Sequence, residues 1–117
     1  MLPKKYRLKG KRNFDRLYKE KGTKGSFFVV KKKENRVGFI RAGVVVSLKV
    51  SSSAVLRNKI RRRVSSVLKC LKKSQGADIV IIALPDCAKA NFEQIKKDLT
   101  FVFKKAGLTG LNEKNPN

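Results

Sequence analysis

The stretch from Ala54 to Lys73 constrains the fold of this chain more than any other, because its apolar residues recur at a helical spacing. Leu56, Ile60 and Val64 are separated by steps of four residues, and Leu71 continues the same line. Residues at this spacing lie on one side of a helix with 3.6 residues per turn. The sequence therefore predicts a long helix with one apolar face that packs on a core.

The other faces of this predicted helix are basic, and no acidic residue occurs from Asn35 through Ala77. A surface helix commonly gains about 0.2–0.5 kcal/mol per pair when Glu precedes Lys or Arg by four residues. Here Arg57 and Arg61 occupy such positions instead and repel each other. Because no internal partner relieves this repulsion, we interpret the basic face as a site for an external anion. The alternative is a solvated face in a protein that is simply basic.

The overall charge favours the first interpretation. The chain has 30 Lys and Arg residues against 8 Asp and Glu residues, a net charge of +22. This imbalance is typical of proteins that bind a polyanion and argues against an enzyme acting on a neutral small molecule. Nucleic acid fits better than a membrane, because no apolar run approaches the roughly 20 residues of a spanning helix. The opening residues also lack the apolar segment of a signal peptide.

Length and cysteine content limit the architecture. With 117 residues and 41% hydrophobic content the chain is long enough for one core, so residues 1–107 are predicted to form a single domain. Residues 108–117 show no periodicity and are predicted to form a flexible tail. Cys70 and Cys87, in a chain without histidine, cannot supply the four ligands of a zinc site. We expect reduced thiols in a cytoplasmic protein, with a disulfide as the alternative.

Periodicity and turn residues predict the remaining elements. The fold class is α+β, a small two-layer α/β sandwich in which helices pack on a mixed central sheet. The expected order is α-β-β-α-β-α, with helix 11–21, strands 27–33 and 37–47, helix 54–73, strand 77–84 and helix 92–106. The first two strands are expected to pair as antiparallel neighbours. The segment 77–84, ADIVIIAL, is apolar throughout, which predicts a central strand.

Residues at the predicted helix ends support these boundaries. The serines at positions 51–53 are plausible caps for helix 54–73, and Asn91 is a cap for the last helix, which Gly107 ends. Lys96, Lys97, Lys104 and Lys105 are expected on the outer side of that last helix, interrupted by Asp98, so this mixed face is a weaker candidate for RNA binding than helix 54–73.

Two aromatic residues lie one turn apart on the first predicted helix. Phe14 and Tyr18 either pack into the core or line a groove in which bases stack. Arg12 and Arg16 flank them, and aromatic rings amid positive charge are a common means of holding single-stranded nucleic acid. On the residues alone, both interpretations stay open.

The segment from Ser47 to Arg63, SLKVSSSAVLRNKIRRR, resembles the signature of the protein subunit of bacterial ribonuclease P. RLKGKRNFDRLYKEKG near the start is similar to the first helix of that family, and ADIVIIALP is similar to its last strand. The resemblance therefore covers most of the chain in the right order. The chain departs from the family pattern at Leu48, where the family has Lys, at positions 51–53, where it has a Gly-Lys turn, and at Ser65 and Ser66, where it has Arg-Glu.

The resemblance implies a fold and a set of partners. It implies a left-handed βαβ crossover, although the general rule for such units is right-handed. It implies that the chain binds the catalytic ribonuclease P RNA through Lys49, Arg57, Asn58, Lys59, Arg61 and Arg62. It implies that a cleft between the first helix and the sheet holds the 5′ leader of precursor tRNA and is lined by Arg12, Phe14, Arg16, Tyr18, Phe28 and Lys31. No protein oligomer is required.

The residue content agrees with a function in which RNA is the catalyst. Hydrolysis of a phosphodiester by protein groups usually takes clustered carboxylates that bind metal ions, or a histidine. This chain has no histidine and eight dispersed carboxylates. We expect an RNA-binding subunit of an endoribonuclease holoenzyme that assists 5′ maturation of tRNA, with no catalytic or metal-binding residue in the protein and with Mg²⁺ held mainly by the RNA. The alternatives are a basic ribosomal protein, another structural RNA binder, a DNA-compacting protein and a free-standing protein nuclease.

Overall fold

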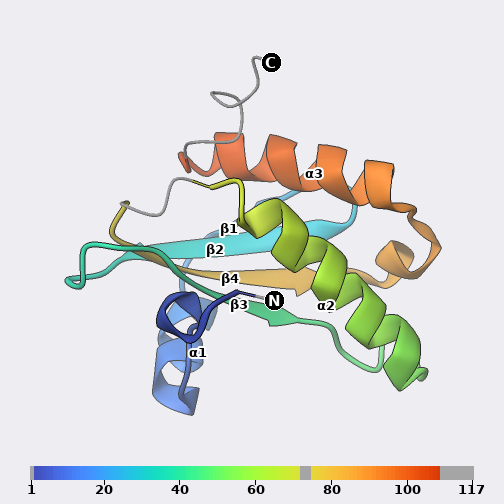
Figure 1. The fold of residues 1–117 in the computed structure, drawn as a ribbon, viewed down its shortest axis with the longest axis horizontal. Coiled ribbons are helices and arrows are strands. Elements are labelled where there is room, and N and C mark those ends of the chain that lie inside the picture. Colours follow the sequence, from blue (N-terminus) through green and yellow to red (C-terminus); the bar gives the residue numbers. More distant parts are fainter. Residues whose placement is uncertain (1, 72–74, 109–117) are drawn as a thin grey trace.

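The structure is a computed structural model that describes residues 2–71 and 75–108, and Figure 1 shows its fold. The α+β class and the predicted order of helices and strands are confirmed, with one short strand, β1, added. Among the described residues, no helix is long and apolar enough to cross a membrane. In chain order the elements are η1 (Lys4–Tyr6), α1 (Lys11–Tyr18), β1 (Gly22–Lys24), β2 (Phe28–Glu34), β3 (Arg41–Val45), α2 (Ala54–Leu68), β4 (Ala77–Ala83), η2 (Pro85–Lys89) and α3 (Phe92–Lys105).

The four strands form one mixed sheet in the order β1-β2-β4-β3. β4 pairs antiparallel with β2 and parallel with β3, so it is the central strand that its apolar sequence predicts. The prediction that β2 and β3 pair with each other is wrong, because β4 lies between them. The residues of β4 are buried on both faces of the sheet, and an interior position buries more apolar surface than an edge position does.

The sequence does not predict β1, whereas the predicted strand 27–33 agrees with β2 to within one residue at each end. β1 pairs antiparallel with β2, with Gly22 opposite Lys31 and Lys24 opposite Val29. β2 continues through Lys31, Lys32 and Lys33 to Glu34, and each of these residues has a register partner in β4. Because side chains alternate along a strand, Lys31 and Lys33 lie on one face of the sheet and Lys32 on the other.

Helices α2 and α3 cover one face of the sheet, and α1 covers part of the other face (Figure 1). The main core lies beneath α2 and α3, and its fully buried side chains include Phe28, Ile79, Ile81, Leu99 and Phe103. A smaller cluster lies beneath α1 and consists of Leu8, Leu17 and Val80. The two faces of the sheet therefore have unequal cover, and the α1 side is the more open one.

The connection from β3 through α2 to β4 is left-handed. In Figure 1 the two parallel strands run to the right, β4 lies above β3, and α2 crosses in front of them. This hand agrees with what the family resemblance implies, and it departs from the right-handed rule for such units. The outer edge of β3 is met by the N-terminal segment, where the Leu8 amide donates to the Ala42 carbonyl at 2.9 Å.

The helix ends follow the predicted caps. Ser53 is the N-cap of α2, and its hydroxyl accepts a hydrogen bond from the Leu56 amide at 3.2 Å. Asn91 and Gln94 form a capping box at the start of α3, and Gly107, with φ of 85°, follows its end. α2 ends at Leu68, so the predicted helix is too long, and its last predicted residues fall partly at 72–74, outside the described residues.

The prediction that Asp98 interrupts the outer side of α3 is wrong. Asp98 is 8% exposed, and its carboxylate accepts hydrogen bonds from the backbone amides of Ser26, Phe27 and Phe28 at 2.7, 2.9 and 3.1 Å. These bonds join α3 to the first residues of β2 across some seventy positions of sequence. Helical spacing places Asp98 at the border of the apolar face, and only the tertiary fold supplies its donors.

The last described residue belongs to the packed structure. Leu108, which the sequence prediction assigns to the tail, is 4% exposed, and its amide donates to the Phe103 carbonyl at 2.9 Å. The rest of the predicted tail, residues 109–117, lies outside the described residues.

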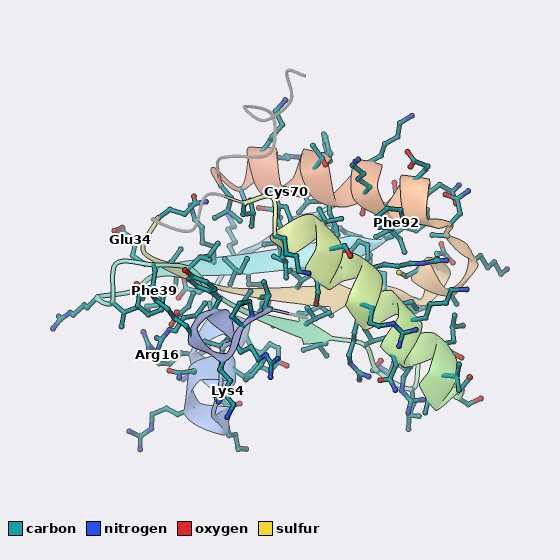
Figure 2. All side chains as sticks on the ribbon, in the orientation of Figure 1. Lys4, Arg16, Glu34, Phe39, Cys70 and Phe92 are labelled. Atoms are coloured by element: carbon teal, nitrogen blue, oxygen red, sulfur yellow. The ribbon has the colours of Figure 1, made fainter. Side chains whose placement is uncertain are left out.

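The two cysteines differ in their surroundings and are both free. Cys70 is exposed just beyond α2 (Figure 2), and Cys87 is buried in η2. Burial, together with the Asp98 carboxylate, raises the pKa of the Cys87 thiol to about 11. Because the thiolate is the reactive form, a thiol reagent at about pH 8 should modify Cys70 readily and Cys87 only after unfolding. Mass spectrometry with and without urea checks this, and equal rates at both cysteines in the native chain would contradict it.

Candidate RNA-binding site

The open face of the sheet carries a row of partly exposed apolar side chains. Val29 of β2, Ile82 of β4 and Val45 of β3 are register partners across three strands, and each is half-buried. We call these three residues the apolar row. Ile82 and Val45 pack against the cluster beneath α1. The row lies beside α1 because that helix, with eight residues, is too short to cover the whole face.

The two aromatic residues of α1 stand beside this row in different environments. Phe14 is half-buried and packs on the same cluster as Val45 and Ile82, whereas Tyr18 is 42% exposed. Their ring centroids are 6.4 Å apart, with the ring planes tilted by 41°. Phe14 therefore contributes to packing, as one of the two sequence interpretations has it, whereas Tyr18 presents its ring to solvent, and the groove for bases stays a prediction.

A hollow beside the edge strand β3 joins the α1 side of the molecule to α2. Phe14, Gly43 and Arg61 line it from α1, β3 and α2, and its other lining residues are Leu2, Arg7, Leu8, Ala42, Val44 and Ser65. A Cβ atom at Gly43 would lie 2.5 Å from Cζ of Phe14, so only glycine lets the ring approach β3 this closely. An aromatic ring and a guanidinium group from distant parts of the chain thus share one hollow.

This close approach makes Gly43→Ala an informative substitution. The added methyl group must displace the Phe14 ring, so we expect a loss of about 1–3 kcal/mol in the free energy of unfolding. Phe14→Leu removes the colliding ring atoms, and the double variant should therefore lose less than the sum of the two single variants. Urea unfolding of the four chains measures this coupling. Strict additivity would show that the ring and Gly43 are not in contact.

The arginines of α2 are oriented by backbone carbonyl groups and are not neutralised by carboxylates. Arg57 Nη1 donates to the Ser51 carbonyl at 2.9 Å, and Arg61 Nη2 donates to the Val46 carbonyl at 3.2 Å. Arg61 Nη1 also donates to Oδ1 of Asn58 at 2.8 Å. Within the described part of the chain, the three ion pairs involve other cations and none of α2. The positive charge of this helix is therefore available to an external anion.

The other residues predicted to bind the RNA subunit are exposed. Asn58 and Arg62 lie one turn apart on α2, next to Arg57 and Arg61. Lys59 lies about 100° further round the helix than Asn58. Lys49 lies in the turn that follows β3. The helix thus places four residues on one side of α2, namely Arg57, Asn58, Arg61 and Arg62. Lys59 borders that side, and Lys49 belongs to the turn before the helix.

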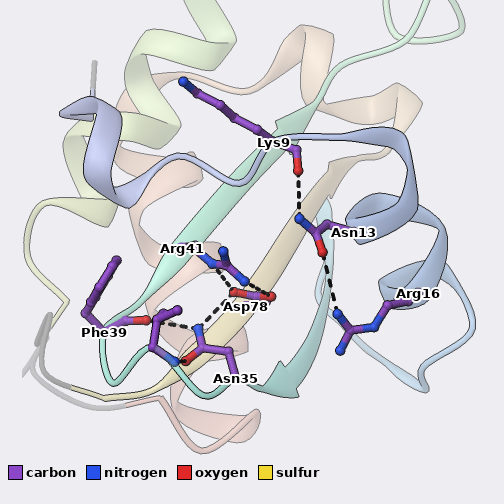
Figure 3. A network of polar contacts seen from close by, with 8 residues as sticks. Lys9, Asn13, Arg16, Asn35, Phe39, Arg41 and Asp78 are labelled. Atoms are coloured by element: carbon purple, nitrogen blue, oxygen red, sulfur yellow. Dashed lines mark hydrogen bonds and ion pairs between the residues drawn. The ribbon is translucent and has the colours of Figure 1, made fainter.

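The predicted leader-binding residues gather around α1, with one exception. Lys31 reaches from β2 to the end of α1, where its Nζ donates to the Tyr18 carbonyl at 2.6 Å. Arg12 and Arg16 are exposed on α1. Figure 3 shows Arg16 bonded to Asn13, which in turn donates to the Lys9 carbonyl.

The exception is Phe28, whose predicted place in the cleft is wrong. Its side chain is 0% exposed and lies in the main core beneath α2 and α3, on the face of the sheet opposite α1. Side chains alternate along β2, so the neighbour Val29 points to the open face in its place. The aromatic character of Phe28 therefore serves packing.

A buried carboxylate fixes the sheet beneath this face. Asp78 of β4 is 3% exposed, and its two oxygens accept from Nε and Nη2 of Arg41 in β3, both at 2.8 Å (Figure 3). The Asn35 side chain donates to the same carboxylate at 2.8 Å and to the Phe39 carbonyl at 3.0 Å. The hydrogen bond that Arg41 donates to Asp78 raises the pKa of Arg41 above its usual value, which keeps the guanidinium group charged. Two nitrogens of the Arg41 guanidinium group are thereby occupied within the chain.

Sequence reasoning missed the apolar row and the hollow. The strands show β-branched residues, but only their register places Val29, Ile82 and Val45 beside one another. The close approach of Phe14 to Gly43 likewise emerges only from the structure. The structure also shows the surroundings of two residues at which the chain departs from the family pattern. Ser65 is buried at the hollow, and Leu48 is 71% exposed next to Lys49 in the chain.

Comparison with known proteins gives one consistent family. The family model described as Ribonuclease P matches residues 2–107. The ribonuclease P protein component of Bacillus cereus strain Q1 is 38% identical over 112 residues, which cover 92% of this chain and 96% of that protein. A ribonuclease P protein component from Thermus thermophilus is 37% identical over 101 residues, which cover 86% of this chain and 60% of that protein.

Solved structures of similar sequence share the fold. A Staphylococcus aureus RNase P protein mutant with defective mRNA degradation activity has a TM-score of 0.82 and 32% identity, with 91% of this chain and 92% of that chain covered. The RNase P protein from Thermotoga maritima has a TM-score of 0.74 and 29% identity, with 85% of this chain and 96% of that chain covered.

Proposed function

Because the chain belongs to the ribonuclease P family, we propose that it is the RNA-binding protein subunit of a ribonuclease P. In this role it binds the catalytic RNA and the 5′ leader of precursor tRNA, and it assists endonucleolytic removal of the leader. The observation that carries the proposal is the shared hollow of Phe14 and Arg61, which joins an aromatic surface for a single strand to a cationic helix without acidic partners in the described part of the chain.

The RNA subunit is the partner of α2. Arg57 and Arg61 each use part of a guanidinium group to bond a loop carbonyl, so their planes are held in place before RNA arrives. Oriented guanidinium groups match phosphate oxygens well, because they present several N–H donors in a fixed fork. Asn58, Lys59 and Arg62 are exposed beside them and extend the contact along the helix. Lys49 extends it into the turn before α2.

The leader is the partner of the open sheet face. Tyr18 and the edge of Phe14 offer aromatic surface, and the apolar row continues it across the sheet. Base stacking on aromatic rings tolerates any sequence, which suits a leader that differs from one precursor to another. Arg12, Arg16 and Lys31 supply positive charge around these rings for the phosphates of the strand.

Bond cleavage belongs to the RNA in this proposal, and the RNA holds most of the Mg²⁺. The two buried carboxylates of the described residues are engaged by the chain's own donors, Asp78 by Arg41 and Asn35 and Asp98 by backbone amides. The protein contributes cations that reduce the repulsion between catalytic RNA and precursor tRNA. Each phosphate contact also steepens the fall of affinity with salt, by about 0.7–0.9 in the logarithmic slope.

Reconstitution with a bacterial ribonuclease P RNA tests the proposal. Cleavage of precursor tRNA is measured at a magnesium concentration too low for the RNA alone, with the chain alone as the control. The proposal predicts cleavage only when RNA and chain are combined. Failure to stimulate cleavage, together with cofractionation with ribosomes, would favour a ribosomal protein. Cleavage by the pure chain would place catalysis in the protein.

A further inference from the structure

The outer side of α3 is an exposed surface of lysines and one phenylalanine that the proposed function does not use. We propose that this α3 surface binds a second segment of single-stranded RNA, with a base stacked on Phe101 and phosphates held by Lys97, Lys104 and Lys105. The α3 surface lies across the sheet from α1 (Figure 1), so it is separate from the surface assigned to the leader. The inference does not depend on a role in tRNA maturation.

Phe101 is an aromatic ring without a packing role. It is 55% exposed and lies between two adjoining hollows. One hollow is lined by Lys97, Thr100, Phe101, Lys104 and Lys105, and the other by Ser26, Phe27, Gln94, Lys97, Asp98 and Phe101. Phe27 is half-buried at the second hollow, so two aromatic residues border a continuous shallow surface. Bases stack on such rings in proteins that bind single strands.

Glu93, one turn before Lys97, is the exposed carboxylate of α3 among the described residues, and the other carboxylate of the helix, Asp98, is turned inward. Its carboxylate is occupied by three backbone amides and does not neutralise the lysines. Lys97, Lys104 and Lys105 form no ion pair within the described residues. Nζ of Lys105 lies over the Phe101 ring, 5.7 Å from the ring centroid, so a cation and an aromatic face already meet at this surface. A nucleotide matches this combination, because it has a flat base that can stack on the ring and a phosphate that can bind the lysines.

Single-stranded RNA fits this surface better than the other occupants. A second copy of the chain would bring like charges together, since each copy has a net charge of +22. An acidic protein would satisfy the lysines but leave the Phe101 ring without a flat partner. A duplex offers phosphates, whereas its bases are already stacked on one another. The combination of lysines with an exposed ring therefore selects an unpaired strand.

The chain contains no tryptophan, so Phe101→Trp introduces a single fluorescent reporter at the site. The probe is a short oligouridylate, and inorganic polyphosphate serves as a ligand that has the charge but no bases. Val37→Trp is the matched control, because Val37 is 44% exposed in the turn between β2 and β3 and the two variants have the same charge. Both full-length variants are titrated in the same salt, and their size is checked by gel filtration.

We expect oligouridylate to quench the fluorescence of the Phe101→Trp variant in a saturable way, to affect the Val37→Trp variant much less, and polyphosphate to compete without quenching. Adding Lys97→Ala and Lys104→Ala should weaken the quenching transition about five-fold or more and reduce its salt slope by about 0.7 per lysine. Equal quenching of both variants, or no quenching of the Phe101→Trp variant, would overturn the inference. A fluorescence change that depends on protein concentration without RNA would also overturn it and assign the surface to a second copy of the chain.

Discussion

Replacing Arg57 and Arg61 together with alanine is expected to lower the affinity of the chain for ribonuclease P RNA by about 10- to 100-fold. Both guanidinium groups are held by loop carbonyls on one flank of α2, and neither has an acidic partner within the described residues. In the proposed role, their loss removes two oriented phosphate contacts. Filter binding over a range of salt concentrations measures the affinity. The slope of log affinity against log salt concentration should become shallower by about 1.4–1.8, which is the contribution of two phosphate contacts.

A matched variant separates this local effect from the general loss of charge. Arg36 and Lys89 are exposed outside α2, so Arg36→Ala with Lys89→Ala removes the same charge from other places. We expect that control to lose only a small part of the affinity. Equal losses in the two double variants would mean that α2 is not the docking face. Urea unfolding of both variants ensures that the chains compared are folded.

Asp98→Ala is expected to lower the free energy of unfolding by about 3–5 kcal/mol, the largest loss of stability that we predict. The substitution leaves the Ser26, Phe27 and Phe28 amides without their acceptor, and the Phe28 bond is fully buried. Hydrogen bonds to a charged group are worth more than neutral ones, and unsatisfied buried donors are costly. Urea unfolding followed by circular dichroism gives the value.

Two further variants make this result specific. Asp98→Asn keeps one acceptor oxygen and replaces the other with a donor, so we expect an intermediate loss. Asp86 is an exposed carboxylate in η2, and Asp86→Ala should change the free energy of unfolding by less than about 0.5 kcal/mol. If Asp98→Ala were as mild as Asp86→Ala, the link between α3 and the start of β2 would not contribute to stability.

The sequence predicts those parts of the fold that local pattern controls. Helical spacing identifies α2 and α3, Ser53 and Asn91 supply side-chain acceptors for their first turns, and the apolar run of β4 indicates a central strand. Each of these features depends on residues within a few positions of one another. The basic face of α2 is predictable for the same reason, since Arg57, Asn58, Arg61 and Arg62 are placed by the helical period alone.

The predictions that were wrong concern features that depend on contacts between distant segments. β2 and β3 are consecutive in the chain, but the more apolar β4 separates them. Asp98 reads as a surface charge until the fold brings three amides to it from some seventy positions away. Phe28 and Val29 differ by one position, and the register with β4 decides which of them faces α1. For the same reason the apolar row could not be read from any single strand.

The affinity gained from the leader tests the central claim most directly. Binding of precursor tRNA and of mature tRNA is compared for the RNA subunit alone and for the holoenzyme. The account predicts that the chain strengthens binding of the precursor far more than binding of mature tRNA. It also predicts that Tyr18→Ala reduces this gain in affinity for the precursor by at least about five-fold, whereas Tyr18→Phe retains the gain. The reason is that the ring, and not the hydroxyl group, supplies the stacking surface. An equal gain for both tRNAs would contradict the account, because the open face of the sheet would then make no contact with the leader.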